Sequence, residues 1–307
     1  MTFSADHRTY WKLAAVTMIW GGTFVAGRYL AASVDPLLAA SLRFVAASLA
    51  LLLFMALARI PLVCPSPAQL SRLALLGFCG IYVYNLCFFY GLQSINASRA
   101  SLIVALNPAV IGLASWLLFK ERFSRAKWLG IALCLGGAAT VIVSRNPQLL
   151  QGSAHAWRGD LLIFGCVLGW GAYSLFSRGL NHSLGPLQTV TWSILLGTAM
   201  LVITTLATGR LTVDGLSAIH SPQVFSLLYL GVLGSALAYI GYYDGLRRIG
   251  ATRAGVFIAL NPLTAVVCGA FLLGEPLTWP MLGGGAVILL GIYLCNKPLA
   301  QARAMGI

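Results

Sequence analysis

The chain has 307 residues, of which 59% are hydrophobic and only 9% are charged, whereas an ordinary soluble domain has about 25% charged residues. A mean hydropathy of +0.86 excludes a chain that is exposed to water over most of its surface. The net charge of +13 would suit a nucleic-acid-binding protein. The basic residues lie between apolar runs, however, where membrane topology accounts for them, so we expect a lipid bilayer and no nucleic acid as partner.

Ten apolar runs follow one another along the chain, each long enough to cross a hydrocarbon layer of about 30 Å. The runs are continuous and do not alternate with polar residues, which favours helices over a barrel. In chain order they cover residues 10–30, 37–58, 71–92, 98–119, 127–144, 160–180, 186–207, 224–246, 252–273 and 279–296. The sequence therefore predicts an all-α integral membrane protein with ten transmembrane helices.

Lysine and arginine residues gather in alternate loops, and membrane proteins retain such residues on the cytoplasmic side. With the N-terminus placed in the cytoplasm, fourteen of them fall inside and five outside, and Arg43 is left within a span. This asymmetry predicts that both termini are cytoplasmic, in a multi-pass protein of a bacterial-type cytoplasmic (inner) membrane.

The second half of the chain repeats the first. WGGTFVAGRYL from Trp20 matches WGAYSLFSRGL from Trp170, at an offset of 150 residues, and ASLIVALNPAV from Ala100 matches AGVFIALNPLT from Ala254, at an offset of 154. Because each copy holds five spans, an odd number, the second copy must cross the membrane in the opposite direction. Secondary transporters use such inverted repeats to enclose a site near the middle of the bilayer.

The loop charges agree with this inversion. The segment KERFSRAK at 120–127 is placed inside, whereas its copy GEPLTWPM at 274–281, placed outside, has no lysine or arginine. The predicted organisation is a cytoplasmic N-terminus (1–9), a first repeat (10–145), an extracytoplasmic linker (146–159), a second repeat (160–297) and a cytoplasmic C-terminus (298–307).

Three shared features carry a resemblance to a known family. Each half has W-G in its first span, A-L-N-P in its fourth span, and a Glu followed three residues later by Ser or Thr before its fifth span. In this order the chain resembles the EamA-type transporters of the drug/metabolite transporter superfamily over about residues 12–297. Its length, aromatic content and lack of buried acids are most similar to the YddG-type amino-acid exporters. The resemblance implies a ten-helix basket around one central cavity, and export of small metabolites, often amino acids.

The third and eighth spans are equivalent in the repeat and rich in aromatic residues. Apolar walls with a few polar tips are typical of small-molecule pockets, although a Tyr also serves as a residue of the interfacial belt. Helical spacing of three or four residues gives one candidate face on each span. We expect the cavity to be lined by Phe78, Tyr82, Asn85 and Phe89 from the third span and by Tyr239 and Tyr243 from the eighth.

Trp20 and Trp170 occupy equivalent positions in the first and sixth spans, and each is followed by Gly. A Trp at such a position either stacks on the substrate or fills the pseudo-symmetry axis, while the Gly lets another helix approach. Thr23, Tyr173 and Ser174 lie about one turn further on and add polar groups that can face the same space.

Arg43 lies roughly 10 Å below the outer end of the second span, and its repeat equivalent is Ser193. A charge at this depth costs several kcal/mol unless it is paired or hydrated, which makes Arg43 a candidate functional residue. Three roles are open. Its guanidinium binds a substrate carboxylate, donates to carbonyl groups at a helix end, or extends outward to water.

Asn107–Pro108 and Asn261–Pro262 lie inside the fourth and ninth spans. A proline frees the carbonyl four residues earlier, so a kink is predicted in both helices. Each Asn amide either bonds the loosened backbone or reaches the substrate. Kinks at matching places also predict hinges at Pro108 and Pro262.

Glu121 and Glu275 precede the fifth and tenth spans, and we expect them to cap helix N-termini or to tie down tight hairpins. Glycine clusters within 130–137 and 283–291 predict close helix packing in those spans. That packing is either within one chain or between subunits, so the sequence allows a monomer or a homodimer.

No acidic residue lies in the middle of a predicted span. A proton-driven exporter of organic cations would need a carboxylate there, so the sequence favours neutral or zwitterionic solutes, moved by facilitated export or exchange. No catalytic cluster, metal-ligand spacing or cofactor motif appears, so we expect no enzyme, metal or cofactor. We expect an exporter of amino acids, aromatic or neutral, that works by alternating access. The alternatives are an exporter of drugs or other metabolites with the same fold, and a channel or non-transport membrane subunit.

Overall fold

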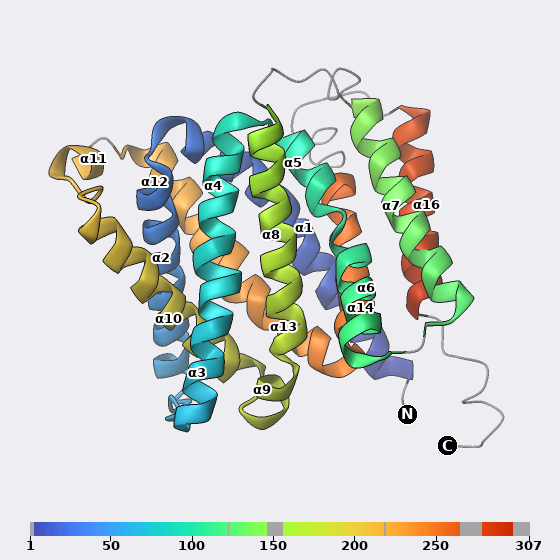
Figure 1. Ribbon diagram of the computed structural model, residues 1–307, viewed down its shortest axis with the longest axis horizontal. Coiled ribbons are helices and arrows are strands. Elements are labelled where there is room, and N and C mark those ends of the chain that lie inside the picture. Colours follow the sequence, from blue (N-terminus) through green and yellow to red (C-terminus); the bar gives the residue numbers. More distant parts are fainter. Residues whose placement is uncertain (1–2, 122, 146–155, 218, 265–277, 297–307) are drawn as a thin grey trace.

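The computed structural model describes residues 3–121, 123–145, 156–217, 219–264 and 278–296, and this part of the chain forms helices and no strands (Figure 1). The first half contains α1 (Phe3–Ser33), α2 (Pro36–Leu57), α3 (Pro67–Leu76), η1 (Gly77–Val83), α4 (Tyr84–Ser94), α5 (Ala97–Val104), α6 (Asn107–Phe119) and α7 (Arg125–Arg145). The second half contains α8 (Ala156–Phe176), α9 (Arg178–Ser183), α10 (Pro186–Ala207), α11 (Val213–Ser217), α12 (Ser221–Leu228), η3 (Tyr229–Leu237), α13 (Ala238–Ile249), α14 (Ala251–Gly255), η4 (Val256–Leu260) and α16 (Trp279–Asn296). The predicted all-α architecture is confirmed.

Eight helical stretches of the described chain are long and apolar enough to cross a membrane. They include two composite helices, α3–η1–α4 (Pro67–Ser94) and α12–η3–α13 (Ser221–Ile249). The first predicted span corresponds to the 31-residue helix α1, which is not among the eight. The ninth predicted span, 252–273, is described only as far as residue 264. The chain is therefore a multi-pass membrane protein, and the count of ten spans stays a prediction.

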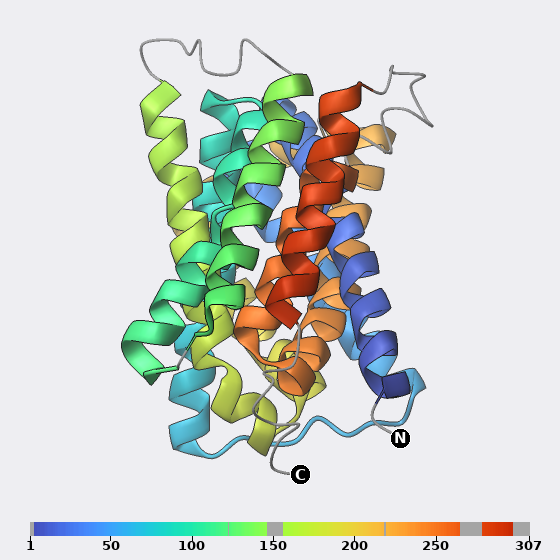
Figure 2. The same cartoon turned by 90° about the vertical axis from the view of Figure 1, so that its right-hand side faces the viewer.

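Equivalent helices of the two halves run in opposite directions. α1 begins at the end of the bundle where α16 ends, which we call the terminal end (Figure 2). Its equivalent α8 begins at the opposite end and leads to α9 at the terminal end (Figure 1). α2 and α10 differ in direction in the same way. The two halves are therefore inverted relative to each other, as an odd number of spans in each repeat requires.

Each half contains a π-helical segment in its third span, η1 in the first and η3 in the second. Glycines in these segments allow a close approach to the second span of the other half. A Cβ on Gly77 would lie 2.7 Å from the Ser193 carbonyl oxygen, and one on Gly231 would lie 2.5 Å from that of Arg43. These two glycines are repeat equivalents, and so are Ser193 and Arg43. The inverted symmetry thus extends to individual backbone contacts.

α7 and α16 pack side by side (Figure 2), and glycines make this packing close. A Cβ on Gly137 would lie 2.7 Å from the Gly284 carbonyl oxygen, and one on Gly130 would lie 2.7 Å from that of Gly291. Gly130 and Gly284 are repeat equivalents, as are Gly137 and Gly291, so the two contacts are related by the inverted symmetry. The close packing predicted for these glycines therefore lies within one chain.

Candidate functional site

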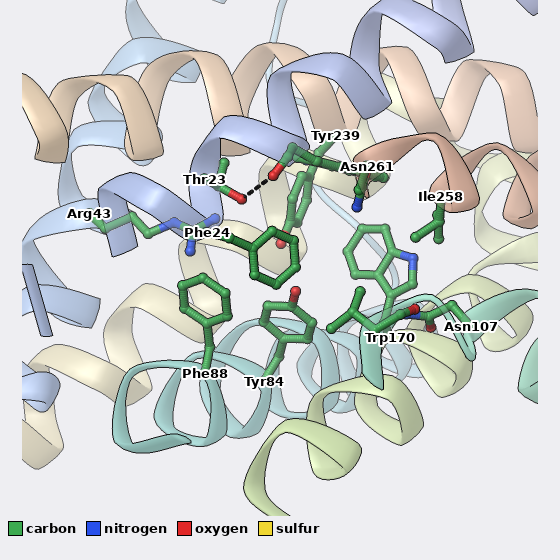
Figure 3. A pocket seen from close by; sticks show the side chains of 12 residues that line it. Thr23, Phe24, Arg43, Tyr84, Phe88, Asn107, Trp170, Tyr239, Ile258 and Asn261 are labelled. Atoms are coloured by element: carbon green, nitrogen blue, oxygen red, sulfur yellow. Dashed lines mark hydrogen bonds between the residues drawn. The ribbon is translucent and has the colours of Figure 1, made fainter. Parts of the chain in front are cut away.

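A small cavity lies inside the bundle, between helices of both halves (Figure 3). Its volume is about 30 Å³, which is room for about one water molecule, so a larger solute enters only when the lining moves. The lining combines aromatic and aliphatic walls with one charged and a few polar side chains, as small-molecule sites do. It consists of Trp20, Thr23, Phe24, Arg43, Tyr84, Phe88, Val104, Asn107, Trp170, Tyr239, Ile258 and Asn261.

Arg43 on α2 is the charged residue of this lining and is only 3% exposed. Its Nε donates to Ser235 Oγ at 3.1 Å, and its Nη1 donates to Asn85 Oδ1 at 3.0 Å. The guanidinium carbon lies 5.2 Å from the ring centroid of Phe44 and 5.8 Å from that of Phe88, where a ring face attracts a cation. Arg43 therefore does not extend outward to water, and its two hydrogen bonds go to side chains and not to helix-end carbonyls.

Both partners of Arg43 are held by carbonyl groups of the π-helical segments. Asn85 Nδ2 donates to the Ile81 carbonyl in η1 at 2.7 Å, and Ser235 Oγ donates to the Leu230 carbonyl in η3 at 2.8 Å. The hydroxyl proton of Ser235 is used in this bond, so its oxygen is left to accept from Arg43. The π-helical segments thus orient two acceptors, one from each half, toward the guanidinium.

Among the acids whose side chains the structure describes, none neutralises Arg43. Asp35 pairs with Arg210, Glu121 with Arg178, Asp160 with Arg99, and Asp244 with Lys12 and Arg248. The two hydrogen bonds of Arg43 use two of its five N–H donors. A buried cation held only by neutral acceptors favours an incoming anionic group, because that group relieves the cost of an unpaired charge.

Trp20 and Trp170 meet across the two halves, edge to face, with their ring centroids 5.0 Å apart. Trp20 Nε1 donates to the Gly234 carbonyl of η3 at 2.9 Å, which fixes the orientation of the indole. The ring of Tyr239 lies 6.1 Å from that of Trp20 and 5.1 Å from that of Trp170. The two tryptophans therefore pack on each other and also line the cavity.

Both Asn–Pro pairs interrupt their helices beside the cavity. Pro108 has no N–H for the Val104 carbonyl, and Asn107 Nδ2 donates to that carbonyl at 2.9 Å. In the second half, the short 3₁₀ segment η4 precedes Asn261, whose backbone N–H bonds the Ile258 carbonyl. The helices are thus interrupted at both predicted places, and the freed carbonyls are satisfied by different means.

Twelve of the fourteen predicted cavity residues fall into two groups. Those that line it are Trp20, Thr23, Arg43, Asn107, Trp170, Tyr239 and Asn261. Those that are buried behind this lining are Asn85, Phe89, Tyr173, Ser174 and Tyr243. Two of the second group form hydrogen bonds that fix neighbouring helices: Tyr173 with Ser193 at 2.5 Å, and Ser174 with Tyr242 at 3.4 Å.

The structure turns two predicted residues of the third span away from the cavity. Phe78 is 45% exposed and stacks on Tyr82, whose hydroxyl bonds Thr204 Oγ1 at 3.1 Å. Tyr84 and Phe88 line the cavity in their place. Phe78 and Tyr82 both lie within the π-helical segment η1, whose bonds between residues i and i+5 replace the α-helical spacing from which the cavity face was predicted.

Glu121 has a partner different from those that the sequence suggested. Its carboxylate forms an ion pair with Arg178 Nη1 at 2.5 Å and accepts from Thr252 Oγ1 at 3.4 Å. At the start of α7 it is Ser124 that acts as the cap, since its Oγ accepts from the Lys127 N–H at 3.3 Å. Glu121 therefore joins the two halves at the terminal end and does not cap a helix. Glu275 lies outside the described residues.

Membrane-crossing helices in two inverted halves, around a buried cavity with polar side chains in its lining, define a membrane transporter. The chain belongs to the EamA-like transporter family, which matches residues 8–143 and again residues 157–297. This match confirms the resemblance seen in the sequence and makes the protein a transporter and not an enzyme.

Several relatives match nearly the whole chain. The uncharacterized transporter YetK of Bacillus subtilis is 25% identical over 93% of this chain and 86% of its own. An uncharacterized transporter of Archaeoglobus fulgidus is 28% identical over 92% of this chain and 97% of its own. A probable amino-acid metabolite efflux pump of Salmonella typhimurium is 27% identical, over 91% of each chain. One solved crystal structure has the same fold, with a TM-score of 0.76 over 95% of this chain and 99% of that chain at 18% identity.

Proposed function

We propose that this transporter exports amino acids, aromatic or neutral, by alternating access through the central cavity. Arg43 carries the proposal, because it is a buried cation with no carboxylate partner among the described side chains and with three N–H donors to spare. A guanidinium binds a carboxylate with two parallel hydrogen bonds. The relative named as a probable amino-acid metabolite efflux pump supports the same substrate class.

The rest of the lining favours a solute with an apolar or aromatic side chain. The rings of Trp20, Trp170 and Tyr239 present faces and edges to the cavity, and aromatic pairs at such distances attract one another. Among the described residues, none of those in the lining carries a carboxylate that could hold an organic cation. An amino acid is therefore a better substrate for this site than a cationic drug, and it moves by facilitated export or exchange.

The distribution of basic residues sets the proposed orientation. Both termini lie in the cytoplasm, with residues 10–145 and 160–297 as the two repeats and residues 146–159 as the outer linker. The protein then lies in the cytoplasmic membrane, and the terminal end of the bundle faces the cell interior. The helix interruptions before Pro108 and Pro262 are the hinges at which the halves move, since the cavity must widen to admit a solute.

Counterflow in liposomes tests the proposal. Purified protein is reconstituted with one unlabelled amino acid inside, and uptake of each of the twenty labelled amino acids is measured. We expect saturable uptake of aromatic or neutral amino acids that the free amino acids inhibit and their methyl esters do not, because an ester has no carboxylate for Arg43. Inhibition by esters and acids alike would contradict the carboxylate site. Single-channel currents in planar bilayers would identify a channel instead.

Tyr239→Ala and Tyr82→Ala compare a residue of the cavity lining with a partly buried residue outside that lining. Tyr239 lines the cavity and is 2% exposed, whereas Tyr82 lies outside the lining. Loss of an aromatic contact of about 1.5 kcal/mol predicts roughly tenfold weaker transport for Tyr239→Ala. Tyr82→Ala is expected to keep transport within twofold of the natural protein. Equal losses in initial counterflow rate for the two variants would show that the cavity is not the transport site.

A further inference from the structure

The cavity has a second polar end, formed by the two asparagines of the repeated A-L-N-P motif. Asn107 and Asn261 are 1% and 4% exposed, and both line the cavity. The amide oxygen of each is buried without a hydrogen-bond partner. A buried acceptor without a donor has lost its hydrogen bonds to water without replacement, so each oxygen favours a ligand that brings an N–H or O–H group.

The two amides are prepared for such a ligand in different ways. The amide nitrogen of Asn107 is held by the Val104 carbonyl, which fixes where its free oxygen points. The amide oxygen of Asn261 has no hydrogen-bond partner, and a half-turn of this amide would present its nitrogen in place of the oxygen. The second end of the cavity thus offers one fixed acceptor and one adaptable amide.

Arg43 and the two asparagines lie at opposite ends of the cavity lining (Figure 3). The ring of Trp170 lies beside the asparagines, and the hydroxyl groups of Tyr84 and Tyr239 point into the space between the two ends (Figure 3). A substrate that uses both ends has a carboxylate, a flat apolar middle and a hydrogen-bond donor at its far end.

We infer that Asn107 and Asn261 form a subsite for a hydrogen-bond donor on the substrate's side chain. The inference rests on the proposed function, in which Arg43 holds the carboxylate. The substrates that fit are amino acids whose ring carries a donor, such as the phenol of tyrosine or the indole N–H of tryptophan. Phenylalanine has the same ring as tyrosine without the donor, and a site that bonds a substrate hydroxyl discriminates against the analogue that lacks it.

Initial counterflow rates of tyrosine and phenylalanine test this subsite. We expect the natural protein to transport tyrosine at least about tenfold more efficiently than phenylalanine. Asn261→Leu should bring the ratio of tyrosine transport to phenylalanine transport close to one. Asn107→Leu should do the same if it folds, and Asn261 keeps the test valid because its amide oxygen has no hydrogen-bond partner to lose. Asn296→Leu is the matched control, since Asn296 also donates to a carbonyl and has an unpartnered buried oxygen, but lies on α16 outside the cavity lining.

Two results would overturn the inference while leaving the proposed function intact. One is equal transport of tyrosine and phenylalanine by the natural protein. The other is an equal loss of tyrosine transport and phenylalanine transport in Asn261→Leu. That result would mean that the asparagines have a structural role or bind a water molecule. If instead no amino acid shows saturable flux, or if the flux does not depend on Arg43, the proposed function itself fails.

Discussion

Arg43→Leu should abolish saturable amino-acid counterflow and leave a folded protein of similar thermal stability. Removing the charged partner of a buried carboxylate costs about 3 kcal/mol or more, which corresponds to at least roughly 100-fold weaker transport. Stability changes little because two effects oppose each other. The variant no longer buries an unpaired charge at a cost of about 3 kcal/mol, but it leaves Asn85 Oδ1 without its donor at a cost of about 1–3 kcal/mol.

Thermal unfolding with and without amino acid separates a binding role from a structural role. A ligand that binds only the folded state raises its melting temperature. Added substrate should therefore stabilise the natural protein and have no effect on Arg43→Leu. Arg210→Gln is the matched control, because Arg210 is 58% exposed in its ion pair with Asp35. Substrate-dependent stabilisation that persists in Arg43→Leu would place the carboxylate elsewhere.

Gly137→Val and Gly284→Val should each destabilise the protein by about 3 kcal/mol, enough to reduce the yield of folded protein. A side chain at Gly137 meets the Gly284 carbonyl, and one at Gly284 meets the side chain of Val141 at 2.7 Å and the Gly137 carbonyl at 2.9 Å. A backbone carbonyl cannot move aside as the end of a flexible side chain can, so α7 and α16 would have to move apart to admit the new side chain. Thermal unfolding in detergent measures the loss.

The glycines next in sequence provide controls for this prediction. A Cβ on Gly136 or on Gly283 would have nothing within 4 Å. Gly136→Val and Gly283→Val therefore change the same helices by the same group without a clash, and both should unfold at temperatures close to that of the natural protein. Comparable losses in all four variants would mean that helix propensity, and not the contact between α7 and α16, accounts for the effect.

The repeat in the sequence predicted the features of the fold that follow from symmetry. Two copies of five spans require inversion, and the paired helix directions show it. Trp20 and Trp170, which are repeat equivalents, meet at the cavity. Arg43 stood out because a charge inside an apolar run has few explanations. These predictions depend on the position of a residue along its span and can be made without knowing how the helix is rotated about its own axis.

The features that the sequence did not predict depend on helix rotation or on contacts between distant segments. Phe78 was placed on the cavity face by α-helical spacing, but it lies in the π-helical segment η1, where the spacing is different. Glu121 was expected to act within its own loop. Its ionic partner Arg178 is 57 residues away, and a pairing of that kind becomes visible only once the two halves are assembled.

The exchange of Arg43 for Ser193 between equivalent positions has a consequence for the transport cycle. Two identical inverted halves would make the inward-open and outward-open forms equivalent by two-fold symmetry, and therefore equal in energy. In the proposed function, Arg43 of one half binds the carboxylate of the substrate and Ser193 of the other half does not, so the substrate would keep a single orientation while the protein rearranges around it. The two open forms are then unequal, and replacing side chains at these two positions is a direct way to change which form the resting protein prefers.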